Sequence, residues 1–261
     1  MKHLIWILSV FAFAKAYTQG PPITADKPIM LGGNSFTFKT LTEIRNTEAG
    51  TFVRAPLMAH YLPSSNSLVA VHIPFVHYDF KDERGSGNTL GDINLLAKYQ
   101  FYRKDGTGKT FRMVAKTLQT LPTGEALDLD GISIDKYAGY YGVVAGYESL
   151  KFGISNEIGY NWIPDGTLDK FQYKLGFGLP LLKPTYPVNQ LNLYFEYSSE
   201  WFVERDAYML LYAQGIQYAR KHWTWEVAIQ LPLVQDGMQN NALNQNNALN
   251  YSLLIGTRYV L

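Results

Sequence analysis

The chain has 261 residues, a formal net charge of +1 and no cysteine. The absence of cysteine excludes a disulfide-stabilised scaffold, thiolate chemistry and a cysteine-ligated metal, and the near-zero charge provides no basic surface for nucleic acid. Aromatic residues make up 15% of the chain and charged residues 17%, whereas an ordinary soluble domain has about 25% charged residues. This composition favours a protein with an extensive apolar and aromatic outer surface.

The start of the chain has the order of a secretion signal. Lys2 and His3 form a short basic head, an apolar run follows from Leu4 to Ala14, and Ala14-Lys15-Ala16 is a small-x-small cleavage site. The apolar run is shorter than the about 20 residues that a membrane-spanning helix needs. We therefore expect a signal peptide at 1–16 and a mature single domain at 17–261, which opens with a short segment at 17–34.

Beyond this segment, apolar and polar residues alternate in stretches typical of β-strands, whose successive side chains change face. Pro56 and Pro74 fall inside two of the stretches, where each removes a hydrogen-bond donor, and we expect a bulge or an end of the pairing there. The predicted strands are Ser35–Arg45, Phe52–Tyr61, Leu68–Asp79, Gly91–Tyr102, Thr110–Leu121, Ala138–Tyr147, Lys151–Trp162, Lys170–Leu179, Gln190–Phe202, Ala207–Ala219, His222–Leu231 and Tyr251–Leu261.

One face of several strands is more apolar than a soluble open sheet would expose. Trp223, Trp225, Ile229 and Leu231 share a face of one strand, and soluble proteins rarely leave apolar patches of this size in water. Lipid is the better partner for such a face. The last strand, Tyr251–Leu261, alternates in the same way and ends on an aromatic residue followed by apolar ones, which is typical of the closing strand of an outer-membrane barrel.

The connections between the predicted strands alternate in length. Most connections after even-numbered strands are short, whereas three after odd-numbered strands are long: Phe80–Leu90, Pro122–Tyr137 and Val234–Ala248. Outer-membrane barrels have short periplasmic turns and longer external loops. We therefore predict an all-β fold, a transmembrane antiparallel β-barrel of about twelve strands in the outer membrane of a Gram-negative bacterium, with both termini periplasmic.

One region of the chain carries a family resemblance. Ile73-Pro74-Phe75-Val76 precedes a glycine-rich stretch, Leu90-Gly91-Asp92-Ile93-Asn94-Leu95 follows it, and Leu121-Pro122-Thr123-Gly124-Glu125 ends the next hairpin. Together they resemble the outer-membrane barrel family named for the meta-pathway of phenol degradation, with a resemblance that extends from about Phe52 to Leu261. It implies a barrel that passes small, often aromatic or apolar, compounds. Asn88-Thr89-Leu90 departs from the tighter Gly-x-Gly-Asp of that family, which leaves the conformation of this loop open.

Polar groups that are costly to bury concentrate on the face that would line the barrel interior. They have two candidate roles: to pair across the interior and hold the barrel rigid, because a buried charge without a partner costs several kcal/mol, or to contact a passing solute. The residues expected to line the lumen, with solute contact as the candidate role, are Arg54, His60, His72, Lys98, Arg112, Lys116, Glu157, Lys174, Glu196, Glu226 and Arg258.

Catalytic and metal-binding interpretations have little support in the sequence. Only His77 and Asp79 fall together near an external rim, and the nearby Ser86 lacks the strand-to-helix elbow of a serine hydrolase, so we expect no enzyme. His60 and His72 have no third ligand of suitable spacing, so we expect no metal.

Four carboxylates in one predicted external loop resemble part of a calcium loop, but the bidentate glutamate expected further on is absent. We expect a solvated acidic loop instead, with divalent-bridged contact to lipopolysaccharide as a side role. The four residues are Glu125, Asp128, Asp130 and Asp135.

The sequence thus predicts a porin-like outer-membrane channel or transporter for the passive passage of small molecules, without a cofactor. The alternatives are a plugged, non-transporting barrel with a structural or surface-interaction role, and an outer-membrane hydrolase. The expected partners are outer-membrane lipid and lipopolysaccharide, the barrel-assembly machinery during insertion, and a small-molecule solute.

Overall fold

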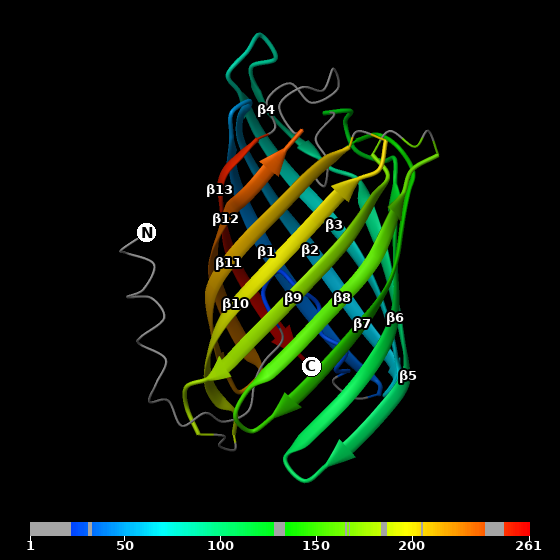
Figure 1. The fold of residues 1–261 in the computed structure, drawn as a ribbon, viewed down its shortest axis with the longest axis vertical. Coiled ribbons are helices and arrows are strands. Elements are labelled where there is room, and N and C mark those ends of the chain that lie inside the picture. Colours follow the sequence, from blue (N-terminus) through cyan, green and yellow to red (C-terminus); the bar gives the residue numbers. More distant parts are fainter. Residues whose placement is uncertain are drawn as a thin grey trace.

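The computed structural model describes residues 22–30, 33–127, 134–164, 166, 168–183, 187–204, 206–237 and 248–261. No helix in these ranges is long and apolar enough to cross a bilayer. The described residues form thirteen strands. Figure 1 shows these strands tilted and side by side around a barrel. The strands are β1 (Ser35–Thr47), β2 (Gly50–Ser64), β3 (Ser67–Phe80), β4 (Ser86–Leu90), β5 (Ile93–Gly106), β6 (Lys109–Leu121), β7 (Ala138–Ser149), β8 (Gly153–Trp162), β9 (Lys170–Pro180), β10 (Asn189–Phe202), β11 (Ala207–Arg220), β12 (Trp223–Asp236) and β13 (Leu249–Val260).

The sheet closes on itself because its first strand pairs with its last. β1 and β13 are antiparallel, with Phe38 opposite Tyr259 and Ile44 opposite Leu253. The other strands pair with their neighbours in chain order, and β4 and β5 both lie beside β3. With β4 and β5 counted as one position, the thirteen strands make a barrel of twelve. The predicted all-β fold and twelve-stranded antiparallel barrel are therefore confirmed.

β4 and β5 are two parts of one long strand that a bulge interrupts. Phe75 of β3 lies opposite Leu90, and His72 lies opposite Asn94, so three steps along β3 match four along its partner. The extra residue is accommodated at Gly91, whose N–H donates to the carbonyl oxygen of Pro74 at 2.8 Å. A proline in β3 is tolerated here because the ladder is already interrupted.

The prediction of a long loop from Phe80 to Leu90 is wrong. Residues 86–90 form β4, so only a tight turn separates the two strands. Gly85 has a φ of 67°, which a glycine adopts without strain, and the Asp82 carboxylate accepts hydrogen bonds from Arg84 across the turn. The stretch Ser86–Leu90 lacks strong apolar alternation, and its strand conformation comes from pairing with β3.

Pro56 also interrupts a ladder. It lies opposite Pro74 in the β2–β3 pair, while on its other side the β1–β2 pairing is broken between Thr40 and Glu43. Proline has no N–H to donate toward β1. The expectation that both prolines mark local breaks in the pairing is confirmed.

The outer face of the wall is apolar and exposed, as the alternation predicts. Trp225 and Ile229 of β12 are each 45% exposed, whereas the residues that directly follow them, Glu226 and Gln230, are buried inside the barrel. Trp223 stacks on Trp225 with ring centroids 6.1 Å apart. Such a surface is suited to a bilayer, with aromatic residues near the interface.

The connections differ between the two ends of the barrel. At the end where the chain enters β1 and leaves β13, the turns after β2, β5 and β11 each consist of two residues: 65–66, 107–108 and 221–222. At the other end lie the longer connections 122–137 and 237–248. We refer to the end with the short turns as the inner end and to the opposite end as the outer end.

Candidate functional site

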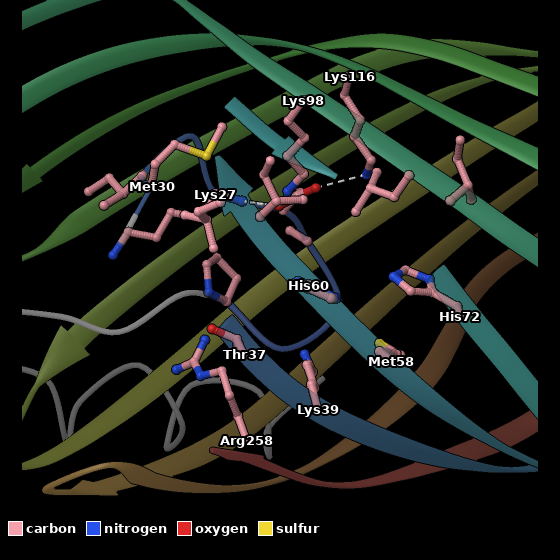
Figure 2. Close-up of a pocket in the computed structure, with 18 of the residues that line it drawn as sticks. Lys27, Met30, Thr37, Lys39, Met58, His60, His72, Lys98, Lys116 and Arg258 are labelled. Atoms are coloured by element: carbon pink, nitrogen blue, oxygen red, sulfur yellow. Dashed lines mark hydrogen bonds and ion pairs between the residues drawn. The ribbon is translucent and has the colours of Figure 1, made fainter. Parts of the chain in front are cut away.

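Residues 22–30 precede β1 and lie inside the barrel, where they contact the inner faces of β5, β6, β7 and β10. We call them the plug segment. Figure 2 shows Lys27 and Met30 of this segment among side chains of the barrel wall. The segment therefore fills part of the lumen with protein.

Glu196 of β10 binds the backbone of the plug segment. Its Oε1 accepts a hydrogen bond from the N–H of Ile23 at 2.8 Å. Its Oε2 accepts from the N–H of Thr24 at 2.7 Å, from the Thr24 hydroxyl at 2.5 Å and from the N–H of Ala25 at 2.5 Å. Glu196 is only 2% exposed. A buried carboxylate with four donors holds the chain strongly, because hydrogen bonds to a charged group are about twice as strong as neutral ones.

Asp26 anchors the centre of the plug segment to two lysines of the wall. Its carboxylate pairs with Lys98 of β5 and, at 2.9 Å, with Lys116 of β6. Burial alone would raise the pKa of the Asp26 carboxyl, but Lys116 and Lys98 outweigh this effect and hold the pKa below its usual range. Lys116 also contacts Glu157 at 2.7 Å. Asp26 therefore completes a network of alternating charges.

The following residue, Lys27, pairs with Glu148 near the inner end of β7. Apolar contacts accompany these ion pairs: Ile23 packs in a buried cluster with Tyr194, Ala228 and Leu254. The plug segment is thus held by charges and by packing.

Three inward glycines make room for the plug segment. A Cβ atom at Gly146, Gly176 or Gly215 would lie within 3.0 Å of a plug side chain, respectively Pro28, Pro22 and Ile23. Glycine within a strand often marks a place where another part of the protein approaches closely. The wall is therefore shaped to receive this segment.

The structure places the eleven predicted lumen residues in four groups. Lys98, Lys116, Glu157 and Glu196 belong to the network around the plug segment. His60, His72 and Arg258 line an inner cavity of about 290 Å³ beside it, drawn in Figure 2. Arg54 and Lys174 line an outer cavity of about 270 Å³. The remaining two lie apart: Glu226 pairs with Lys39 at 3.0 Å, and Arg112 lies 3.7 Å from Asp105 near the β5–β6 turn.

The sequence interpretation missed Asp26, Lys27 and Glu148. Through these residues the plug segment forms ion pairs with the barrel wall and so occupies the lumen. Asp26 and Lys27 lie in a short segment without periodicity, between Pro22 and Pro28. Two adjacent opposite charges in a mostly apolar stretch are the signal that this segment itself offers.

His60 and His72 stack with ring centroids 5.3 Å apart. The Nε2 atom of each ring is buried and has no hydrogen-bond partner among the described residues. No group of three or more histidine, aspartate or glutamate side chains that could hold a metal occurs in the described part of the chain. With Lys39, Lys98 and Arg258 lining the same cavity, a metal cation would meet positive charge here.

Asp92, at the β4–β5 bulge, anchors the connection between β6 and β7. Its Oδ1 accepts hydrogen bonds from the N–H groups of Thr123 and Gly124 at 3.2 and 3.0 Å, and its Oδ2 accepts from the N–H of Ile134 at 2.9 Å. Both Gly91-Asp92 and Thr123-Gly124 belong to the motifs that carry the family resemblance. Their physical role is to turn this connection inward across the outer end.

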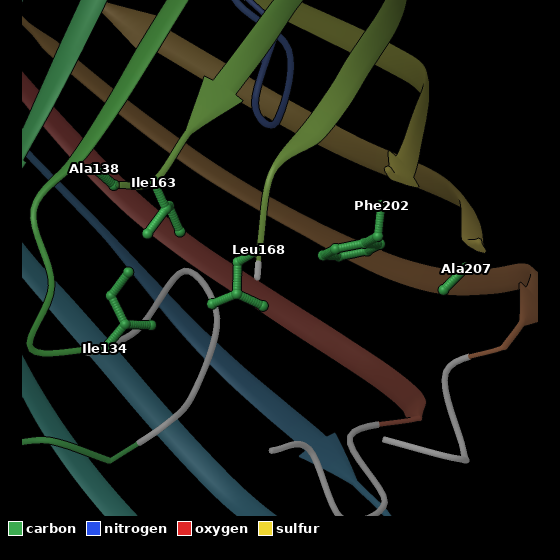
Figure 3. Close-up of a cluster of buried hydrophobic side chains, with 6 residues drawn as sticks. All are labelled: Ile134, Ala138, Ile163, Leu168, Phe202 and Ala207. Atoms are coloured by element: carbon green, nitrogen blue, oxygen red, sulfur yellow. The ribbon is translucent and has the colours of Figure 1, made fainter. Parts of the chain in front are cut away.

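Apolar side chains gather at the same end. Ile134 packs with Ala138, Ile163, Leu168, Phe202 and Ala207 (Figure 3). Of the four carboxylates considered for calcium, Asp128 and Asp130 lie outside the described residues. His77, considered for catalysis, lies on the exposed β3–β4 hairpin, with its Nδ1 2.9 Å from Asn88 Oδ1. Among the described residues its ring is hydrogen-bonded neither to Ser86 nor to Asp79.

Replacing Asp92 by alanine should release the β6–β7 connection, because three backbone N–H groups would lose their acceptor. The N–H of Ile134 is buried, and a buried donor without an acceptor costs about 1–3 kcal/mol. We expect faster trypsin cleavage at Lys136 in the folded barrel. Asp135→Asn, an exposed change in the same connection, is the control. Unchanged cleavage in the Asp92 variant would contradict this anchoring role.

Comparisons with known proteins agree on the fold class. No family model matches the sequence, and no curated protein matches it. Solved structures do: an outer-membrane channel from Pseudomonas putida F1 is 11% identical, with 92% of this chain and 100% of that chain covered and a TM-score of 0.60. The NanC porin is 9% identical, with coverages of 85% and 98% and a TM-score of 0.52. The β-domain of the Bordetella autotransporter BrkA is 12% identical, with coverages of 88% and 100% and a TM-score of 0.51.

The fold and the occupied lumen thus define a twelve-stranded β-barrel of the outer-membrane type. At these identities the likeness concerns the fold. Channels, a porin and an autotransporter domain share it, so the function has to be argued from the lumen.

Proposed function

We propose that this protein is an outer-membrane channel for small molecules whose own N-terminal segment closes it at rest. The observation that carries the proposal is the binding of residues 23–25 by Glu196. These contacts are strong but polar, so water can replace them if the segment leaves. A barrel filled only to be rigid has no need of an anchor that is built from reversible ion pairs and hydrogen bonds.

The setting of this channel is part of the proposal. We infer cleavage of a signal peptide at 1–16, a mature domain at 17–261 and location in the bacterial outer membrane, with lipid and lipopolysaccharide around the wall and insertion by the barrel-assembly machinery. Support comes from the apolar outer face, from the order of the first sixteen residues and from neighbours that are outer-membrane barrels.

The solute is proposed to be small. The inner and outer cavities of the lumen have volumes of about 290 and 270 Å³, just below the roughly 300–1,000 Å³ of typical small-molecule sites. The resemblance to the phenol meta-pathway family supports aromatic or apolar character, and the lumen residues named from the sequence are the candidate solute contacts.

A permanently plugged barrel is the second candidate. The close fit of Pro22, Ile23 and Pro28 against three inner glycines favours it. In that case the loops at the outer end, and not the lumen, would carry the function. The two candidates differ in one measurable respect, which is whether the segment ever leaves.

Conductance in planar bilayers separates them. Glu196→Ala removes four hydrogen bonds from the plug segment, and a loss of even about 1.4 kcal/mol shifts the ratio of bound to released segment about tenfold. We therefore expect more frequent openings than in the wild type, and a constantly open state after deletion of residues 17–30.

Glu200→Ala is the matched control, because Glu200 lies on the same face of β10 but pairs with Lys170 at 2.8 Å. It should conduct like the wild type. A folded barrel that stays closed after deletion of residues 17–30 would contradict the channel proposal.

A further inference from the structure

We propose that the outer cavity of the lumen binds a small organic anion, a carboxylate with an apolar body. This inference rests on the proposed function and names the class of its solute. The cavity has a volume of about 270 Å³ and is lined by polar and apolar residues, among which four are basic: Arg54, Lys116, Lys170 and Lys174.

Two of these four cations have carboxylate partners within the barrel. Lys116 contacts Glu157 at 2.7 Å and also Asp26. Lys170 contacts Glu200 at 2.8 Å. Their charges are balanced, and they form part of the fixed frame of the cavity.

Arg54 and Lys174 form no direct ion pair with a carboxylate among the described residues, although Glu43 and Glu157 on the neighbouring strands attract them through space. The Nε–H of Arg54 is buried and donates no hydrogen bond to any described residue. The nearest acid on the neighbouring strand, Glu43, is already bound to Arg45 at 3.0 Å and to the hydroxyl of Ser252 at 2.9 Å. A buried N–H donor on a charged group is costly to leave unpaired, and a carboxylate fits a guanidinium with two parallel hydrogen bonds.

The acids of the cavity are already engaged in direct contacts with other groups. Asp92 also lines the cavity, but its two oxygens accept hydrogen bonds from the backbone of the β6–β7 connection. Glu157 is bound by Lys116 and by the hydroxyl of Tyr140, each at 2.7 Å. Among the described residues that line the cavity, Arg54 and Lys174 are therefore the basic side chains without a direct ion pair, and they are the groups available to a bound carboxylate.

The rest of the lining defines the body of the solute. Leu118, Ile134 and Ala138 provide an apolar side, and Tyr140 provides an aromatic ring. The volume limits the solute to a few heavy atoms around one ring or a short chain. A small aromatic or branched carboxylate satisfies the charge, the size and the apolar side together.

Calorimetric titration of the complete mature protein in detergent with benzoate tests this. Benzamide, which has the same shape without the charge, is the comparison ligand. We expect benzoate to bind about tenfold more tightly than benzamide, since charge-assisted hydrogen bonds are about twice as strong as neutral ones. Arg54→Gln and Lys174→Gln should each weaken benzoate binding about tenfold and leave benzamide binding unchanged.

Lys151→Gln, an exposed change in the β7–β8 turn outside the lumen, is the control and should bind benzoate like the wild type. Heat-modifiable migration on gels shows that each variant is folded. Equal affinities for the two ligands, full benzoate affinity in both glutamine variants, or no binding even after deletion of residues 17–30 would overturn the inference. If the barrel binds benzoate but never conducts, the inferred anion site is supported and the proposed channel function is refuted.

Discussion

Replacing Ile229 by arginine should destabilise the barrel by about 2–4 kcal/mol when it is measured in a lipid bilayer, the cost of a basic side chain at the midplane of the lipid-facing wall. Ile229 lies at the middle of β12 and is 45% exposed on the outer face. An arginine side chain at this position would be surrounded by lipid, with no carboxylate beside it to pair with. Reversible denaturant unfolding in vesicles gives the free energy directly.

Two variants serve as controls for this result. Ile229→Ala removes the same side chain without adding a charge. Leu233→Arg lies on the same face of the same strand, four residues nearer the outer end, and should cost less, because the penalty falls to about 0–1 kcal/mol near the interface. Equal costs at 229 and 233 would mean that depth in a bilayer does not govern these positions.

Deleting Tyr259–Leu261 should prevent closure of the barrel altogether. These residues form the last part of the seam between β1 and β13: Tyr259 lies opposite Phe38 and Val260 opposite Thr37, and the N–H of Leu261 donates to the Phe36 carbonyl at 2.9 Å. The ring of Tyr259 also packs on the ring of Trp223, with ring centroids 4.7 Å apart. A membrane cannot tolerate the unpaired strand edge that would result.

The truncated protein is therefore expected to reach the periplasm, to lose heat-modifiable migration and to be degraded. Tyr259→Phe keeps the seam and the ring, and should behave as the wild type. Normal yield of the truncated protein in the outer-membrane fraction would mean that closure does not depend on these rungs.

The strands and their phase could be predicted because lipid imposes a simple pattern. Trp225 and Ile229 are apolar and face the bilayer, whereas Glu226 and Gln230, which directly follow them, are polar and face the lumen. The alternation alone therefore assigns each side chain to a face. The short strand Ser86–Leu90 escaped prediction because it has no such pattern. Its conformation depends on pairing with β3, which no local rule reveals.

The contents of the lumen could be predicted only in part. The alternation of side chains along each strand predicted that Lys98, Lys116 and Glu196 face the lumen. Their partners in the plug segment, however, lie far away in the sequence and show no periodicity. Glu196 bonds to residues more than 170 positions earlier. The inward glycines at 146, 176 and 215 were the available hint, since a strand rarely gives up side chains in its interior unless another part of the chain approaches closely.

The position of the plug segment bears on the order of events during assembly. Its polar anchors described above lie on β5, β6, β7 and β10, whereas the barrel is sealed between β1 and β13. A sheet that is still open can therefore already hold residues 22–30 against its concave side. The last strand then encloses a segment that was bound before the seam formed, and no threading of the N-terminus through a finished barrel is required.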